Sequence, residues 1–431
     1  MKKVYISIAS LLLCGSMLMA QSPANRTSKT IVADVLAQMP AEQQAEYNKL
    51  INDLSSTGEE GLLMLINKIH APGKVSNSNV DYALSGLTHY VMAKGEENAR
   101  LVTANAYLKA LDKVSDRETK AFIIRQLQLL GKDECVDTLA SYLNDESLSG
   151  PAARALSAIR TDNAKKVLVA SLMSRSGTPK TQKDIIRAIA AVQIADAENV
   201  LKAMLGSSDE NMQKEVLYAL SRVGSKASLS DLAAVAEKAG YKMEKTGANE
   251  AYIALIKRVL EQGDTKDAEK AANDLLKKST KAGMTQTREA ALQILLAAKP
   301  EAATKNLLSA LKDTDKGYRN AALNFASGFA DQNVYIEVMK HMLKAKPEVK
   351  VDILNWIGRE SKCPSKHDVI KNLELRFDLP ARQVLLDQLK DKDFYVQQAA
   401  VWALVKIGDK SVIPVLADLL KSNDKQVILL G

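Results

Sequence analysis

A short phrase recurs along most of this sequence. It consists of a small residue, an aliphatic residue, two variable positions, a second aliphatic residue and often a glycine, as in Ala-Leu-Val-Lys-Ile-Gly at 403–408. We take the first aliphatic residue of each copy as its anchor. The ten anchors, of which the seventh and eighth belong to looser copies, are Leu84, Leu127, Leu156, Ile189, Leu220, Val259, Leu295, Ala326, Leu354 and Leu404.

The spacing of the anchors limits the fold. From Leu127 to Leu354 the intervals are 29, 33, 31, 39, 36, 31 and 28 residues, which is enough for two helices and two turns. Such a unit cannot bury its apolar stripe alone, so neighbouring units must stack. The aliphatic pair faces the core. We therefore predict an all-α fold, an α-solenoid (α-α superhelix) of about ten helix pairs, in which glycine ends a helix in a left-handed turn.

Two longer intervals and the composition fit this prediction. The gaps of 43 and 50 residues predict insertions, namely a longer helix around 96–114 and a segment containing Cys363-Pro364-Ser365-Lys366-His367. A chain of 431 residues is too long for one compact core. Its 20 glycines, 10 prolines and 4% aromatic residues suit helices better than a sandwich, a barrel or a disordered chain.

The first twenty residues form a separate segment. Lys2 and Lys3 precede an apolar run from Val4 to Met19, and Ala20 precedes a polar stretch. This order is typical of a secretory signal peptide cleaved after Ala20, which predicts a periplasmic or secreted protein. A membrane anchor is the alternative, but the run is short for a span. Lipidation at Cys14 is less favoured, because Leu13 stands where a lipobox needs a small residue.

We predict three parts: a signal peptide at 1–20, an N-terminal helical cap at 21–78 and the repeat solenoid at 79–431. In the cap, Thr57-Gly58-Glu59-Glu60 is the pattern of a capping box. The apolar end Val427-Ile428-Leu429-Leu430 is unlike the polar face of a terminal repeat, so we expect a solenoid truncated at its C-terminal end.

The repeats resemble the short bacterial form of HEAT repeats. The stretch from Asp391 to Leu404 follows that consensus, except that Gln397 stands where arginine is usual. Tetratricopeptide repeats have a similar period, but their Trp, Gly, Tyr and Pro positions are not filled here. The resemblance implies HEAT-like helix pairs.

The N-terminal part carries a second resemblance. The stretches 57–61, 71–74 and 82–87 resemble a family of large exported bacterial proteins. In that family HEAT repeats precede a C-terminal β-sandwich domain of the 3-keto-disaccharide hydrolase type. The resemblance implies that a full-length protein acts on 3-keto-glycosides in the periplasm, with this region as its scaffold. The enzymatic domain is absent from these residues, so no catalytic residue carries over.

Charge and cysteines give weaker indications. The net charge is +8, and the removal of Lys2 and Lys3 leaves +6. The lysine-rich segment 238–281 could serve an acidic partner such as an anionic glycan, but interleaved acidic residues favour solvated helix faces. Nucleic acid is disfavoured, because few aromatic residues lie among these lysines. We expect Cys135 and Cys363 to be unpaired, buried, small apolar residues.

No catalytic or metal site is predicted. The four histidines lack partners at metal-ligand spacing, and the sequence contains no Cys-x-x-Cys and no phosphate-binding or nucleophile-elbow motif. No cofactor is expected. Cys363 with His367 gives too few ligands for a metal.

Two features are candidate binding residues. The loop Pro72-Gly73-Lys74 could bind a ligand, although such a loop is more often a connection. Trp356 and Trp402 could stack on a sugar or a partner, although packing between repeats is the commoner role of a helical tryptophan. The sequence thus predicts an exported, non-catalytic scaffold with a concave surface for a protein partner or a covalently linked C-terminal domain. The alternatives are the N-terminal arm of a glycan-processing enzyme and a glycan-binding protein.

Overall fold

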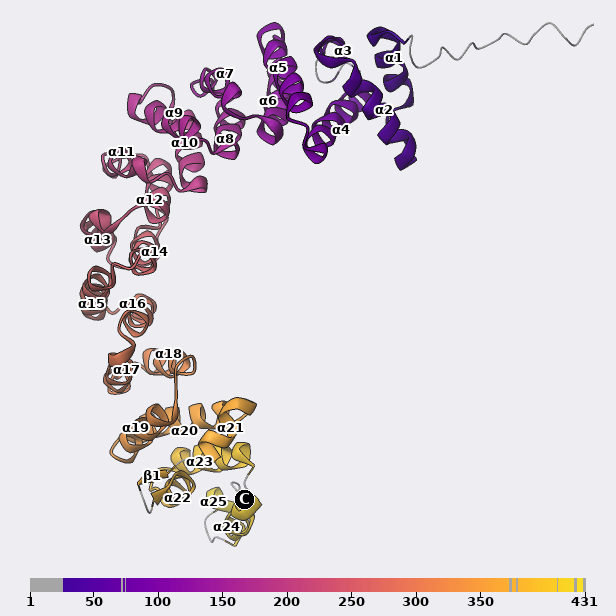
Figure 1. Cartoon of the computed structure of the whole chain (residues 1–431). Helices are drawn as coiled ribbons and strands as arrows, with labels where there is room; N and C mark the ends of the chain where they lie inside the picture. Colours follow the sequence, from indigo (N-terminus) through magenta and orange to yellow (C-terminus); the bar gives the residue numbers. More distant parts are fainter. Residues whose placement is uncertain are drawn as a thin grey trace, which may run out of the picture. The chain divides into compact units, whose positions relative to one another are not determined.

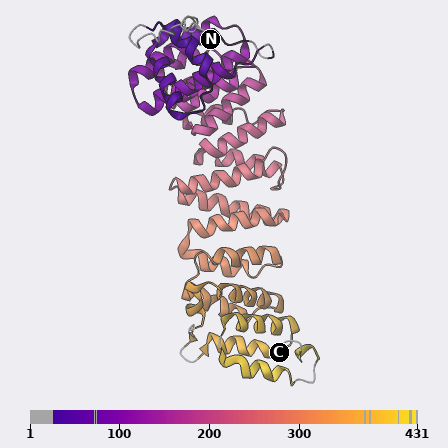
Figure 2. The ribbon, with the colours of Figure 1, turned by 90° about the vertical axis from the view of Figure 1, so that its right-hand side faces the viewer.

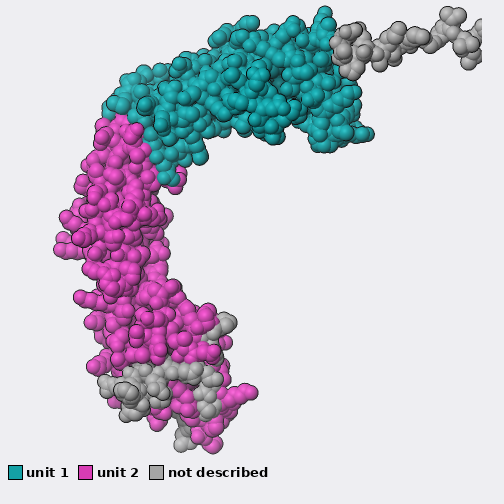
Figure 3. Space-filling view, viewed as in Figure 1, with its two compact units in different colours: residues 1–194 teal, residues 195–431 magenta. Residues whose placement is uncertain are grey.

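The computed structural model describes residues 26–70, 73, 75–371, 374–376, 379–408, 410–421 and 425–428. The predicted signal peptide therefore lies outside the described residues. The chain divides into two compact units, residues 1–194 (unit 1) and 195–431 (unit 2), shown in Figure 3. The predicted division into a cap and a solenoid does not include this boundary. Each unit is described by itself.

Unit 1 consists of helices in two layers, as Figure 1 shows. Successive helices alternate between the layers, so that α3 contacts α5 and α6 contacts α8. Layer A contains α1 (Ser28–Gln38), α3 (Gly58–Ile66), α5 (Glu97–Lys113), α7 (Val136–Ala140) and α9 (Asp162–Ser174). Layer B contains α2 (Gln44–Ser56), α4 (Ser78–Lys94), α6 (Arg117–Leu130), α8 (Ser149–Ile159) and α10 (Pro179–Val192).

Unit 2 repeats this arrangement. Its layer B helices are successive, nearly parallel elements in Figure 2. Layer A contains α11 (Glu198–Lys202), α13 (Leu229–Lys238), α15 (Thr265–Ala282), α17 (Ala303–Ala310), α19 (Gln332–Leu343) and α22 (Ala381–Asp387). Layer B contains α12 (Glu210–Val223), α14 (Ala248–Glu261), α16 (Thr285–Ala298), α18 (Lys316–Ala326), α20 (Pro347–Glu360) and α23 (Phe394–Ile407). Helices α24 (Ile413–Leu419) and α25 (Lys425–Ile428) follow.

The predicted insertions are present. The longer helix expected around 96–114 is α5. The second interval holds α21 (Pro364–Lys371) and an antiparallel hairpin of β1 (Glu374–Arg376) and β2 (Leu379–Pro380). Short 3-10 turns precede several helices: η2 (Asp133–Cys135), η3 (Ala195–Ala197), η4 (Lys226–Ser228) and η5 (Pro300–Ala302) precede layer A helices, and η7 (Lys410–Val412) precedes α24. The turn η6 (Gln388–Lys390) follows α22.

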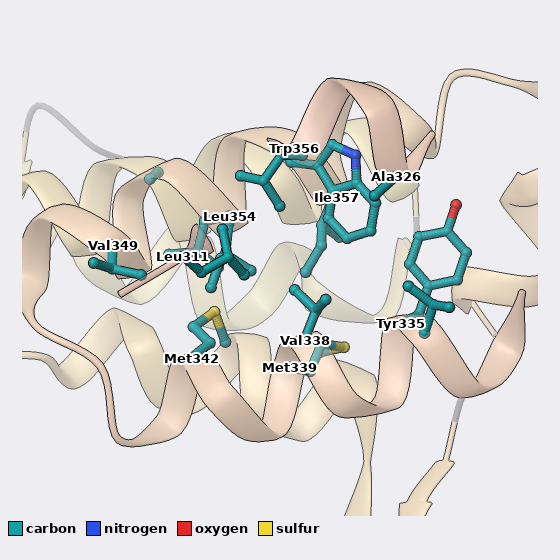
Figure 4. Close-up of a cluster of buried hydrophobic side chains, with 14 of the residues drawn as sticks. Leu311, Ala326, Tyr335, Val338, Met339, Met342, Val349, Leu354, Trp356 and Ile357 are labelled. Carbon is teal, nitrogen blue, oxygen red and sulfur yellow. The ribbon is translucent and has the colours of Figure 1, made fainter. Parts of the chain in front are cut away.

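The α-solenoid prediction is confirmed, because every anchor is buried in a different layer B helix. In unit 2, side chains of α19 and α20 point toward one another across the layers (Figure 4). Val338, Met339 and Met342 of α19 meet Leu354 and Ile357 of α20 in this cluster. Burial of such side chains is the main stabilising term, worth roughly 1.5–3 kcal/mol each.

The predicted left-handed glycine turns are only partly correct. Gly408 has φ +67° as expected, whereas Gly131 and Gly224 are extended, with φ −68° and −63°. At these two positions a Cβ would lie 2.6 Å from the carbonyl oxygen of Leu127 or Leu220. Close packing, and not a positive φ, therefore explains these glycines.

The capping box at Thr57 is also wrong. Thr57 has helical backbone angles, because α3 follows α2 without a loop. Its hydroxyl donates backward to the carbonyl oxygen of Leu54 at 2.6 Å, so it does not cap α3.

Candidate interaction surface

Polar caps set a common register in the layer B helices. Asp116, Thr178, Asp315 and Asp393 each accept a hydrogen bond from a backbone N–H in the first turn of the following helix. These caps satisfy backbone donors that the helix leaves unpaired. The buried anchor follows the cap by eleven residues in each case, as Leu127 follows Asp116.

Helices α4, α8 and α14, whose N-caps are Asn77, Leu148 and Gly247, do not follow this count. In α20 the count indicates a different anchor. The N-cap of α20 is Lys346, so the equivalent buried position is Ile357 rather than Leu354. The phrase at 353–358 contains several aliphatic residues, all facing the core, and the sequence pattern was therefore matched one turn too early.

Two residues before each anchor, the layer B helices present a side chain on the side away from the core. Two residues correspond to about 200° around an α-helix, which explains this orientation. In unit 1 these residues are Tyr82, Arg125, Arg154 and Arg187, and in unit 2 they are Tyr218, Lys257, Gln293, Asn324, Asn355 and Trp402. We call this set the outer register. Asn355 and Trp402 are half-buried, and the others are exposed.

The outer register in unit 1 is mainly basic. Arg125, Arg154 and Arg187 lie on the neighbouring helices α6, α8 and α10. Tyr82 on α4 adds an aromatic ring with 43% of its surface exposed.

The outer register in unit 2 is aromatic and amide-rich. Tyr218 is 55% exposed, and Tyr395 in the first turn of α23 is 67% exposed. Lys257 Nζ donates to Gln293 Oε1 at 3.1 Å, and Arg359 Nη2 donates to Asn324 Oδ1 at 3.2 Å. These bonds connect successive layer B helices while the groups stay accessible to a partner.

The two tryptophans differ in accessibility. Trp356 is fully buried, stacks on Tyr335 with ring centroids 5.1 Å apart and donates to Ser327 Oγ at 3.1 Å. Its indole is therefore not available to a ligand in this structure. Trp402 is half-buried and packs on Gly358 of α20, with Lys406 Nζ 5.8 Å from its ring centroid. A role for Trp402 in binding stays a prediction.

The candidate loop 72–74 is largely outside the described residues. Of its three members only Gly73 is described; it is exposed, with φ +82°. A positive φ suits a connecting turn, and the predicted binding role of Pro72, Gly73 and Lys74 stays a prediction.

A shallow depression of about 370 Å³ lies where α18, α20 and α23 begin. Tyr395, Lys316 and Glu348 contribute to its lining. The buried ion pair between Arg319 and Asp352 also borders it, with Arg319 Nη2 and Asp352 Oδ2 2.7 Å apart. Gln397, which replaces the usual arginine, donates to the Asp391 carbonyl at 2.8 Å, as Arg319 does to the Asp313 carbonyl at 3.0 Å.

The lysine-rich segment lines a groove of about 670 Å³ between α13 and α15. Lys278 Nζ lies 3.0 Å from Glu237 Oε2 and 3.3 Å from Asp274 Oδ2, and the hydrogen bond that Lys278 donates to Glu237 raises the pKa of this lysine. Lys226 pairs with Asp264 at 2.8 Å in the same region. The acidic neighbours thus balance much of the positive charge.

The cysteines behave differently from one another. Cys135 is buried as predicted, whereas Cys363 is exposed, which corrects the expectation that both are buried. Cys363 follows the last turn of α20, where the inserted segment begins. No cluster of possible metal ligands occurs among the described residues, and none of the helices described there is long and apolar enough to cross a membrane.

Comparison with known proteins agrees with the helical architecture. Residues 169–253 and 356–429 match the family of HEAT repeats. The chain contains a HEAT-repeat region. The resemblance of the repeats to this family is therefore confirmed for these two segments. No curated protein matches the sequence.

Solved structures add a likeness in fold. Kap121p is similar with a TM-score of 0.51 and 12% identity, over 93% of this chain and 48% of Kap121p. The TM-score is 0.54 for Kap121p bound to Nup53p and 0.53 for Kap121p bound to Ste12p. Each of these two comparisons has 12% identity and covers 94% of this chain and 48% of Kap121p. This chain spans about half the length of these structures, and at such identity the likeness concerns the fold alone.

The outer register could have been found from the sequence. The anchors define it once each position two residues earlier is examined, and Arg125, Arg154 and Arg187 then align. The candidate binding residues predicted from the sequence are a loop and two tryptophans, and of the outer register they include only Trp402.

Proposed function

We propose that this chain is a non-catalytic HEAT-repeat scaffold that binds a protein partner through the exposed face of layer B. The observation that supports this proposal is the outer register. It places a side chain that can contact a protein partner at the same position of successive repeats. Exposed tyrosine, tryptophan and arginine are the residues most enriched at binding hot spots.

The fold supports this proposal. A stack of repeats offers an extended surface because each repeat contacts only its neighbours. The similar solenoid Kap121p is bound to Nup53p in one structure and to Ste12p in another, so a fold of this kind can hold protein partners.

We also propose that the protein is exported to the periplasm or secreted. The support is the order of charge, apolar run and small residue at 1–20. Detection of a mature N-terminus near Gln21 in the periplasmic fraction tests this point. An uncleaved N-terminus in the cytoplasm would contradict it.

The alternative partner is a covalently linked C-terminal domain of the 3-keto-disaccharide hydrolase type. Its support is the resemblance of residues 57–61, 71–74 and 82–87. Reading the gene beyond the codon for Gly431 tests it. An open frame encoding a β-sandwich is expected, and a stop codon at that point would exclude a linked domain.

Co-purification tests the scaffold proposal. The variant Tyr218→Ser with Tyr395→Ser removes two exposed aromatic rings from layer B of unit 2. The matched control, Met173→Ser with Leu343→Ser, removes exposed apolar side chains from layer A helices α9 and α19. We expect partners retained by the wild-type protein to be lost from the first variant and kept by the control. Equal retention by both variants would contradict a layer B interface.

A further inference from the structure

Three arginines of unit 1 form a regular row. Arg125 and Arg187 each follow by nine residues the N-cap of their helix, Asp116 or Thr178. Arg154 follows by nine residues Asp145, which accepts from the backbone N–H of Leu148 just before α8. All three are exposed, and each precedes by two residues an anchor that is fully buried. They therefore occupy equivalent positions on α6, α8 and α10. We call them the arginine row.

The spacing of the row follows from helix packing. Helix α8 packs against α6 on one side and against α10 on the other. Packed helices lie about 8–10 Å apart. The three helices run in the same direction, because one returning helix separates each from the next. Equivalent side chains therefore recur at about that distance along a line across the helices.

Two of the guanidinium groups lie near residues of α8 and α10. A Cβ built on Gly150 would lie 3.3 Å from Arg154 Nη1 and 3.4 Å from Asp184 Oδ2, so Arg154 extends over the contact between α8 and α10. Asp184 Oδ1 lies 3.8 Å from Arg187 and its other oxygen accepts from Ser149 at 2.7 Å. Asp184 is only 14% exposed, whereas Arg187 is 56% exposed, so the cation and not the acid faces the solvent.

The row has an apolar border. Tyr82 of α4 is exposed, Leu129 of α6 is 46% exposed and Phe122 of α6 is half-buried. These side chains lie on the two helices at the Arg125 end. The surface thus offers spaced cations with an apolar patch at one end, which fits a polypeptide better than a free ion.

We propose that the arginine row binds an extended acidic segment of the partner, with a carboxylate at every third residue and in the polyproline II conformation. This inference rests on the proposed scaffold function. Polyproline II has three residues per turn and a rise of about 3.1 Å, so residues i and i+3 share a face about 9.3 Å apart. That distance matches the helix spacing. In a β-strand, same-face residues recur at about 6.8 Å, which does not match.

Arginine suits this role by its chemistry. Its planar guanidinium donates two parallel hydrogen bonds to a carboxylate, and it stays charged at all physiological pH values. An already extended ligand loses little chain entropy on binding.

Fluorescence anisotropy with synthetic peptides tests the inference on the mature full chain. One labelled peptide contains four Glu-Pro-Pro triplets, and a second has the same composition with its four glutamates contiguous. At low ionic strength we expect the patterned peptide to bind at least about fivefold more tightly. Raising the salt should weaken its binding, because exposed charges are screened.

Substitutions locate the site. Arg125→Gln, Arg154→Gln and Arg187→Gln should each weaken binding of the patterned peptide about two- to fivefold, the range measured for exposed ion pairs. The affinity of Arg154→Lys for the patterned peptide should lie between that of the wild-type protein and that of Arg154→Gln, because lysine keeps the charge and loses the paired donors. The matched control is Arg160→Gln, at the exposed C-cap of α8. It should bind like the wild-type protein, and all variants should keep their helicity by circular dichroism.

Three results would overturn the inference. The first is equal affinity for the two peptides. The second is an affinity of the row variants for the patterned peptide equal to that of Arg160→Gln. The third is binding of phosphatidylserine vesicles through the same arginines in preference to the peptide. The patterned peptide could fail to bind while Tyr218→Ser with Tyr395→Ser still abolishes co-purification. In that case the scaffold proposal stands, and only the binding role of the arginine row is excluded.

Discussion

At the scale of single residues, charged groups inside the helix layers are held by fixed protein partners. Arg319 and Asp352 are both about 2% exposed, and Arg319 also donates to the backbone carbonyls of Asp313 and Thr314 at 3.0 and 3.1 Å. Because both ions have lost their water, the pair itself contributes little net stability, whereas removal of one partner leaves the other uncompensated.

Asp352→Ala tests this reasoning. It should lower the free energy of unfolding by about 3–5 kcal/mol, because the Arg319 charge stays buried without its partner. The double variant Arg319→Met with Asp352→Leu should lose much less stability than Asp352→Ala, because no buried charge stays unpaired. Urea unfolding followed by circular dichroism measures both. Asp418→Ala, in the exposed pair with Lys421, is the control and should change stability by less than about 1 kcal/mol. An equally small effect of Asp352→Ala would contradict the account.

Glu360 makes part of the stability of unit 2 dependent on pH. Burial raises the pKa of this carboxyl, but hydrogen bonds from Lys366, Ser327 and Tyr335 outweigh burial and leave the pKa below its ordinary value of 4.5. A carboxyl with a depressed pKa in the folded state stabilises it above the unfolded pKa and loses that effect as the pH falls through the folded pKa.

The pH dependence is measured by comparing wild-type protein with Glu360→Gln. Near neutral pH the wild-type protein should be the more stable. Below about pH 4.5 the difference in free energy of unfolding should shrink steadily as Glu360 becomes protonated. A difference that stays constant from pH 7 to pH 3 would show that the ionised carboxylate does not stabilise the fold.

The two described thiols should react differently. Burial raises the pKa of Cys135 to about 12, whereas the hydrogen bond with Ser365 lowers the pKa of the exposed Cys363 below its ordinary value. Thiolate is the reactive form. In a chain that begins at Gln21 and so lacks Cys14, iodoacetamide should therefore label Cys363 in the native protein and Cys135 only after unfolding. Cys363→Ser should abolish native labelling of this chain. Rapid native labelling of Cys135 would contradict its burial.

At the scale of elements, glycine permits close contact between layer B helices. A Cβ on Gly358 of α20 would lie 2.3 and 2.5 Å from two ring carbons of Trp402 on α23. Trp402 therefore packs between repeats, while part of its surface stays accessible.

Gly358→Ala should destabilise the protein by roughly 1–3 kcal/mol, because the indole must move to admit a methyl group. Adding Trp402→Ala should remove this additional cost. Gly206→Ala is the matched control, since no atom lies within 4 Å of its added Cβ. Chemical unfolding measures all three. A neutral Gly358→Ala on its own would show that the contact is looser than the structure indicates.

Element positions were largely predictable, because apolar periodicity and helix caps are local properties of the sequence. The anchors identified the layer B helices, and the gap of 43 residues predicted the long helix α5. The close approach at Gly358 was not predictable, since it depends on Trp402 of another helix. The exposure of Cys363 was missed because the inserted α21 and hairpin do not follow the repeat pattern.

At the scale of the whole molecule, the chain comprises two units, and each unit has two layers of helices of its own. The chemistry of the outer register changes along the chain. Unit 1 presents the arginine row, whereas unit 2 presents tyrosine, tryptophan and amide side chains. This difference suggests that the two units recognise different features of a partner. Partner identity depends on a second molecule and could not be predicted from the repeat pattern.

Site-specific photo-crosslinking tests the central claim most directly, namely that layer B is the binding face. A crosslinking amino acid would replace, one at a time, the exposed layer B residues Arg154, Tyr218, Gln293 and Asn324 and the exposed layer A residues Met173, Ala234, Asn273 and Leu343. The account predicts crosslinks to a protein partner from layer B positions and none from layer A positions. Crosslinks mainly from layer A would contradict it.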